Sequence, residues 1–103
     1  MKKQVFEQAR SHIVEASQAL RPKRVDDLRS LTTKQERETL KFGGKDFEVC
    51  AWARDHGSDK IAVVVEARTK TFLGWKVTAE GFYKDTEGVI SDFAEKDYWE
   101  HDY

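Results

Sequence analysis

A chain of 103 residues that is 36% charged and 39% hydrophobic, with a net charge of −1, has the composition of one folded domain. This hydrophobic content excludes a disordered chain, and no run approaches the roughly 18 apolar residues that a membrane span requires. A lone cysteine, Cys50, excludes an internal disulfide, so we expect a cytoplasmic protein with no membrane partner.

The charge is unevenly distributed along the chain. Residues 1–45 carry a net charge of +5, residues 46–90 carry −2 and residues 91–103 carry −4. Such an asymmetry either steers a charged partner towards the protein or lets two parts of one chain attract each other. We favour the second interpretation.

Residues 3–20 have the apolar periodicity of an amphipathic helix, which must end before Pro22 because proline cannot continue a helix. The apolar stripe consists of Val5, Phe6, Ala9, Ile13, Ala16 and Leu20. A helix with such a stripe needs an apolar surface to cover. The only candidate surface is a sheet formed by the rest of the chain.

Residues 21–35 are predicted to form a helical or irregular connection, because Val25, Leu28 and Leu31 have the spacing of about two helical turns. The segment from Thr33 to Glu36 has the spacing of a capping box, which would start a further helix at that point.

The alternative for residues 33–42 is a strand that belongs to a β-hairpin. Gly43 and Gly44 would form a two-residue turn that pairs Leu40 with Phe47. We favour the hairpin because its register places four apolar residues on one face. These four are Leu40, Phe42, Phe47 and Val49.

Residues 36–92 are predicted to form an antiparallel meander sheet of four or five strands. Its interior strand is 61–67, where three consecutive valines suit a pleated surface that is buried on both faces. Gly81 interrupts an alternating pattern, which indicates a bulge or a close approach by the helix. The predicted fold class is therefore α+β, with the helix of residues 1–20 packed as a single layer on the sheet.

No motif in the sequence indicates catalysis or a bound cofactor. The three histidines, His12, His56 and His101, have no His or Cys neighbour at the spacing of zinc ligands. Cys50, on a strand beside Trp52, has the context of a small buried hydrophobic residue rather than a nucleophile. We predict no enzyme, no catalytic or metal-binding residue and no cofactor.

The connection 70–75 places Phe72, Leu73 and Trp75 around a glycine, although connections are normally polar. Such a segment either folds back as a lid over the core or is exposed to bind a partner. We favour the lid.

Residues 93–103 form an acidic tail that contains the aromatic residues Phe93, Tyr98, Trp99 and Tyr103. Either Phe93 and Trp99 dock on the sheet while the acids face water, or the tail presents aromatic and acidic groups to a partner.

These features predict a small protein-binding module, such as an inhibitor, an immunity protein or an adaptor. It would use a sheet face and the acidic tail to bind a partner that carries a basic patch. The candidate contact residues are Phe72, Leu73, Trp75, Tyr98, Trp99, Glu100, Asp102 and Tyr103.

Two alternatives belong to other functional classes. A nucleic-acid-binding domain would use the basic turn of Arg21, Lys23 and Arg24 together with strand aromatics, but the acidic C-terminus makes this unfavourable. A small-ligand-binding domain would hold its ligand between the helix and the sheet, near Cys50, Trp52 and Trp75.

Overall fold

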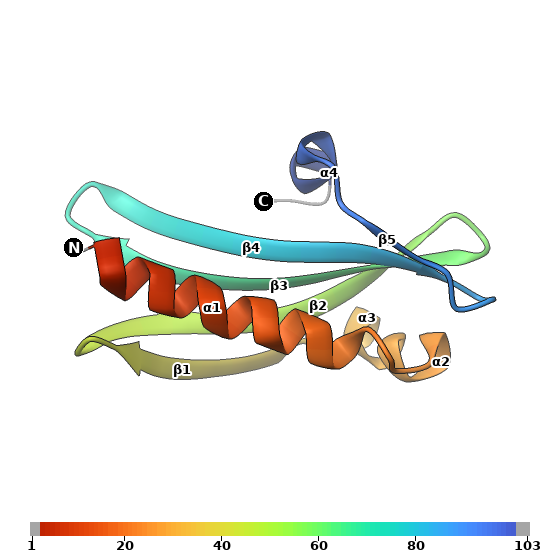
Figure 1. The fold of residues 1–103 in the computed structure, drawn as a ribbon, viewed down its shortest axis with the longest axis horizontal. Coiled ribbons are helices and arrows are strands. Elements are labelled where there is room, and N and C mark those ends of the chain that lie inside the picture. The colour runs from red at the N-terminus through yellow and green to blue at the C-terminus, as the bar shows by residue number, and fades with distance from the viewer. Residues whose placement is uncertain (1–2, 101–103) are drawn as a thin grey trace.

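The computed structural model describes residues 3–100, with Trp99 and Glu100 described by their backbone alone. The N-terminal helix α1 (Lys3–Leu20) lies along one face of a five-stranded antiparallel sheet (Figure 1). The predicted α+β class and the predicted meander are confirmed. We call the sheet face that α1 covers the helix face and the opposite one the far face.

The strands follow each other in space in the order in which they occur in the sequence. They are β1 (Glu36–Phe42), β2 (Lys45–His56), β3 (Lys60–Thr71), β4 (Gly74–Asp85) and β5 (Ile90–Asp92). Between α1 and β1 lie two single-turn helices, and a short helix follows β5. These helices are α2 (Val25–Leu28), α3 (Ser30–Thr33) and α4 (Glu95–Glu100).

The core lies between α1 and the helix face of the sheet. The predicted stripe of α1 is confirmed: Ala9, Ile13 and Leu20 are buried, and the remaining stripe residues are partly buried against them. Phe47 and Phe82 contribute the largest fully buried side chains of the sheet. Burying each such large side chain stabilises the fold by about 1.5–3 kcal/mol before conformational entropy is counted.

β3 is the central strand and is buried on both faces, as its sequence predicts. Val63 and Val65 face α1, whereas Ala62 and Val64 lie on the far face, and all four have exposed fractions between 0% and 3%. The stiff, β-branched valines thus fill the positions where a pleated surface is covered on both sides.

The β1–β2 hairpin has the predicted register, with Leu40 opposite Phe47. Gly43 and Gly44 have φ angles of 57° and 79°, so both turn residues have the left-handed backbone that glycine adopts without steric cost. The helix suggested by the capping-box spacing does not form, because α3 ends at Thr33 and β1 begins three residues later.

At Gly81 the sequence indicated a bulge or a close approach by the helix. A close approach is present, but the group that approaches is not the helix. Gly81 remains in register opposite Val64, so β4 has no bulge there. A Cβ atom at this position would lie 2.5 Å from the ring of Phe93, not against α1. The reason is the alternation of a strand: Phe82 faces α1, and its neighbour therefore faces the other side.

Candidate binding surface

The hairpin formed by β3 and β4 continues beyond the point at which β3 stops pairing with β2. Pairing between β2 and β3 ends with Glu48 opposite Arg68, whereas pairing between β3 and β4 continues to Thr71 opposite Gly74. Beyond that point three further pairs join β3 to β4, while residues 45–47 of β2 continue to pair with β1. The turn of this hairpin lies at the same end of the molecule as the start of α1 (Figure 1).

The apolar side chains of this hairpin are exposed. Phe72 is 96% exposed, Leu73 85%, Trp75 56% and Val77 39%. We call these four residues the hairpin tip. The lid predicted from the sequence is wrong, because the connection is shorter than a lid requires. Only Phe72 and Leu73 separate the two paired strands, so they cannot fold back over the core.

The turn is held in place by Thr71. Its hydroxyl donates a hydrogen bond to the carbonyl oxygen of Gly74 at 2.9 Å and accepts one from the backbone N–H of Leu73 at 3.3 Å. The side chain that could have offered a polar group to a partner is thus used within the turn. The tip presents hydrocarbon and aromatic surface.

Trp75 lies on the far face against Arg68. The Arg68 guanidinium is 5.0 Å from the centre of the Trp75 ring, and it also forms an ion pair with Glu48 at 3.1 Å. The stacked cation and the carboxylate fix the orientation of a half-exposed indole, which reduces the entropy that the indole would lose on binding.

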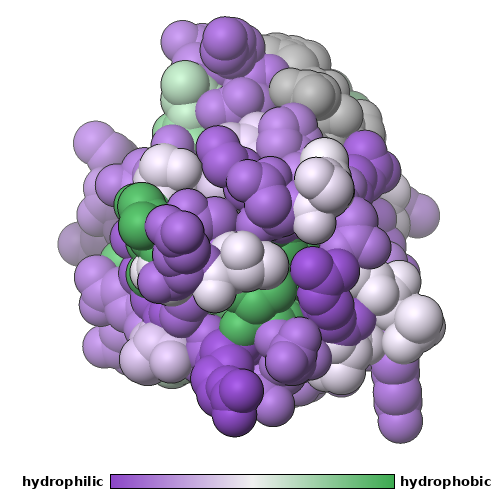
Figure 2. Space-filling model, turned by 90° about the vertical axis from the view of Figure 1, so that its right-hand side faces the viewer, coloured by the Kyte–Doolittle hydropathy of each residue, from purple (hydrophilic) through white to green (hydrophobic). Residues whose placement is uncertain are grey.

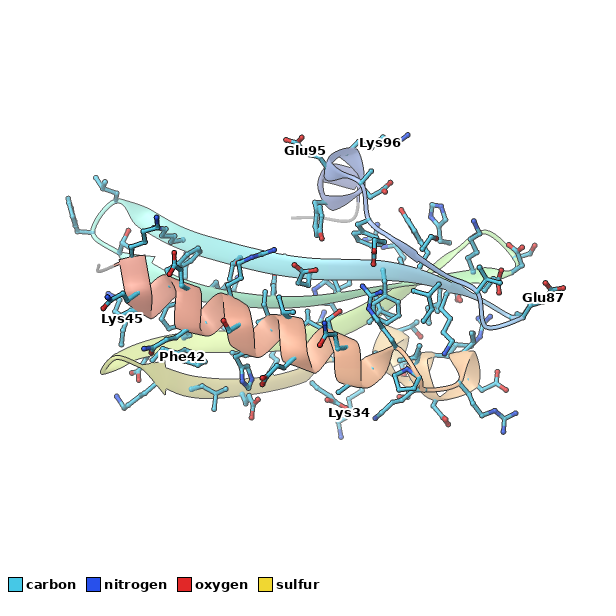
Figure 3. The ribbon with its side chains drawn as sticks, viewed as in Figure 1. Lys34, Phe42, Lys45, Glu87, Glu95 and Lys96 are labelled. Atoms are coloured by element: carbon cyan, nitrogen blue, oxygen red, sulfur yellow. The ribbon has the colours of Figure 1, made fainter. Side chains whose placement is uncertain are left out.

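Lysines surround the hairpin tip. Lys70 and Lys76 flank it and are exposed, and residues 69–79 contain no acidic residue. Three more lysines, Lys3, Lys41 and Lys45, lie near the start of α1 or at the neighbouring β1–β2 turn, and Figure 3 shows Lys45 beside the start of α1. Two of these have carboxylate partners: Lys3 is 3.9 Å from Glu7, and Lys41 is 2.7 Å from Asp46.

The described part of the tail packs on its own sheet. Phe93 contacts Tyr83 with ring centres 4.6 Å apart, and Tyr98 packs edge-on against Phe93 at 5.2 Å. The Tyr98 hydroxyl accepts a hydrogen bond from the backbone N–H of Gly81, and burial raises the pKa of this phenol. Of the candidate residues in the tail, the side chains of Trp99 and Glu100 lie outside the described residues, as do Asp102 and Tyr103.

The strand aromatic that the basic turn contacts is fully buried, so it offers no stacking surface to a base. Arg21 donates to Asp92 at 2.5 Å and stacks on Phe82, a helix-face residue. Lys23 and Arg24 follow it in the exposed connection before α2. Trp75, by contrast, belongs to the far face.

The predicted ligand site near Cys50, Trp52 and Trp75 is not between the helix and the sheet, because these three residues occupy the far face. Cys50 is buried there, its thiol donates a hydrogen bond to the Gln35 side chain at 3.4 Å, and burial raises the pKa of the thiol. The hollow between α1 and the sheet, about 390 Å³, lies elsewhere. It is lined by His12, Ala16, Ala19, Leu20, Lys23, Glu36, Arg37, Glu38, Val49, Ala51 and Val65.

Sequence reasoning selected three of the four tip residues but missed Val77 and the two flanking lysines. Val77 is two residues beyond Trp75 and therefore on the same face of β4, which was a usable signal. Lys70 and Lys76 lie on either side of the apolar connection in the sequence, so their proximity to the tip could also have been predicted.

Comparisons with known proteins add no family or relative. No protein-family model matches the chain, and neither a curated protein nor a solved structure is significantly similar to it. Within residues 3–100, no helix has the length and apolar character needed to cross a membrane. Among the same residues, no group of three or more His, Cys, Asp or Glu side chains is arranged to hold a metal ion.

Proposed function

We propose that the chain is a non-enzymatic binding module that docks on a larger partner through the hairpin tip. The observation that carries this proposal is the concentration of exposed apolar surface. Five large hydrophobic residues are exposed among those described, and four of them form the hairpin tip. Contiguous exposed apolar surface of this kind is typical of interaction sites, since it gains free energy when it is covered.

The charge around the tip favours an acidic partner. The tail predicted a partner with a basic patch, but Phe93 and Tyr98 are engaged with the chain's own sheet. The exposed aromatic and aliphatic groups are instead flanked by Lys70 and Lys76. Lysines at the rim of a contact accelerate encounter with an acidic surface, while the apolar centre determines how slowly the complex dissociates.

The surface at the opposite end of the molecule is more hydrophilic than the hairpin tip. Figure 2 shows this end as a predominantly hydrophilic surface with small, separate hydrophobic areas. Its exposed large hydrophobic residue is Val89, which is 61% exposed in the turn before β5. Val89 therefore provides a control for exposed apolar surface that is not part of the tip.

The proposal is tested by comparing three immobilised proteins in a cell lysate that retains its membranes: the wild type, Phe72→Ser/Leu73→Ser and Val89→Ser. The proteins and lipids that the wild type retains should also be retained by Val89→Ser and lost from the double variant. Losing one well-packed anchor residue typically weakens a contact by about 2 kcal/mol. Equal retention by all three proteins would contradict docking through the tip.

A further inference from the structure

We propose that the surface on which the hairpin tip docks is an anionic lipid bilayer. This inference rests on the proposed function, because it names the partner of the same site. It is carried by the order in which side chains follow each other from the turn towards the body of the protein.

The order of side chains along the hairpin matches the order of layers in a bilayer surface. Phe72 and Leu73 form the turn itself, Thr71 and Gly74 form the first pair behind it, and Trp75 lies in the second pair, opposite Lys70. Lys76 lies one pair further back, opposite Thr69. The turn thus presents hydrocarbon, which suits the acyl region. The indole behind it suits the interface, and the lysines beside and behind the indole carry ammonium groups that suit the phosphates.

The spacing of these side chains fits an interfacial depth. Successive pairs along a hairpin are about 3.3 Å apart, so the lysine stems, which belong to the second and third pairs, begin about 7–10 Å behind the turn residues. Interfacial segments bury their apolar groups by about 5–10 Å at the boundary between headgroups and acyl chains. At that depth the long side chain of Lys70 reaches the phosphates of the same leaflet, and Lys76, whose ammonium group lies 4.5 Å from the centre of the Phe6 ring, reaches them by turning away from this ring.

The shape of the tip favours a bilayer over a protein pocket. Phe72 and Leu73 protrude from a two-residue turn, and the Thr71 hydroxyl is hydrogen-bonded within that turn. A protein would need a preformed hollow to receive such a convex group and would gain no directional hydrogen bond from this hydroxyl. A fluid bilayer deforms around the group without a preformed complement.

The charge of the surrounding surface extends the argument beyond the tip. Lys45 adds positive charge at the end of the molecule that would face the bilayer, whereas Lys3 and Lys41 are paired with Glu7 and Asp46. Each basic residue near an anionic leaflet contributes favourably, and the contribution falls off within a Debye length. The binding should therefore weaken as salt is added. Such surface contact needs no spanning segment, so it modifies the expectation that the protein has no membrane partner.

Sedimentation with vesicles tests this inference on the full chain. The probes are vesicles of phosphatidylcholine alone and of phosphatidylcholine with about 30% phosphatidylserine, an anionic lipid. The wild type and Val89→Ser should bind the anionic vesicles and bind the neutral ones more weakly. Phe72→Ser/Leu73→Ser should lose roughly a hundredfold in partitioning, because several buried carbon groups are removed. Lys70→Gln/Lys76→Gln should lose roughly tenfold, and on anionic vesicles only.

A fluorescence measurement separates insertion from simple attraction. With vesicles of brominated lipid, which quench nearby indoles, the wild type should be quenched. Trp75→Phe should lose most of that quenching while it still sediments. The melting temperatures of all variants should match that of the wild type, because the changed side chains are exposed.

The outcomes distinguish the two proposals. The bilayer inference is overturned if the wild type does not bind anionic vesicles. It is also overturned if Phe72→Ser/Leu73→Ser binds them as strongly as the wild type does. If the wild type also retains lysate proteins through the tip, docking through the tip stands and its partner is a protein. If neither vesicles nor lysate distinguish the tip variants, both proposals fail.

Discussion

At the scale of single residues, burial on one face of a strand decides the chemistry of Cys50. The thiol lies on the far face and is only 4% exposed. Desolvation is the largest influence and raises the pKa of the thiol, and the guanidinium of Arg37 opposes this by stabilising the thiolate. A buried thiol with a raised pKa is a poor nucleophile, since the thiolate is the reactive form.

We therefore expect Cys50 to react slowly with a thiol reagent in the native protein and rapidly in denaturant. The raised pKa also predicts a pH dependence. Below the ordinary thiol pKa of 9.0 both folded and unfolded thiols are protonated, so no stability is lost. Above it the unfolded thiol ionises first, and stability falls by at most about 1.4 kcal/mol per pH unit until the raised folded pKa is reached.

Denaturant titrations of the wild type and Cys50→Val between about pH 8 and pH 10 check this expectation. The wild type should lose more stability than the variant as the pH rises, because only the wild type carries this thiol. Rapid labelling of the native protein, or identical pH profiles, would show that the thiol is accessible and ordinary.

At the scale of elements, the β1–β2 hairpin is specified by two glycines that carry different constraints. Both have positive φ angles, but their surroundings differ. A Cβ atom at Gly43 would lie 2.5 Å from Cγ2 of Val5, whereas one at Gly44 would meet no atom within 4 Å. Gly43 thus serves both the turn and the packing of α1 against it.

We expect Gly44→Ala to cost about 1–2 kcal/mol, which is the strain of a left-handed backbone. Gly43→Ala should cost more, because the same strain is joined by a clash with Val5. The difference should shrink in a Val5→Ala background, where the clashing methyl group is absent. Urea denaturation of the four glycine variants and of both parent proteins measures it. Equal costs in the two backgrounds would refute the contact.

At the scale of the whole molecule, one buried lysine ties the end of α1 to the sheet. Lys84 belongs to the helix face of β4 and is 7% exposed. Its ammonium group donates to the carbonyl oxygens of Arg21 and Lys23, at 2.5 Å and 2.6 Å. Two carbonyl groups of the turn that follows α1 thereby find a partner in the other layer of the fold.

Lys84→Met keeps most of the side chain's volume but leaves both carbonyl oxygens without this donor. We expect a loss of about 2–3 kcal/mol in the free energy of unfolding, the cost of burying unsatisfied polar groups. Lys60→Met is the matched control, because Lys60 is an exposed lysine at the start of β3. That change should stay within about 0.5 kcal/mol of the wild type. Equal losses in the two variants would indicate a general effect of removing a charge.

Local patterns in the sequence were sufficient for α1, for the strands of the sheet and for their order, but not for α4. The apolar stripe of residues 3–20, the two glycines of the first hairpin and the valines of 61–67 each specify an element through periodicity or turn chemistry. Such signals act over a few residues, which is why the helix, the meander and the register of Leu40 with Phe47 could be predicted. They also selected Phe72, Leu73 and Trp75 as residues in an unusual context.

Only the tertiary structure decided how distant segments meet. Gly81 accommodates Phe93 rather than the helix, and Lys84 bonds to carbonyl groups more than 60 residues away. Whether the 70–75 connection forms a lid depended on how far the β3–β4 pairing continues towards the turn, a length that the alternating pattern leaves open. Periodicity fixes which side of a strand a residue occupies, whereas exposure depends on what other parts of the chain cover that side. Among residues 3–100, no neighbouring element covers the end of this hairpin, and Phe72 and Leu73 are exposed for that reason.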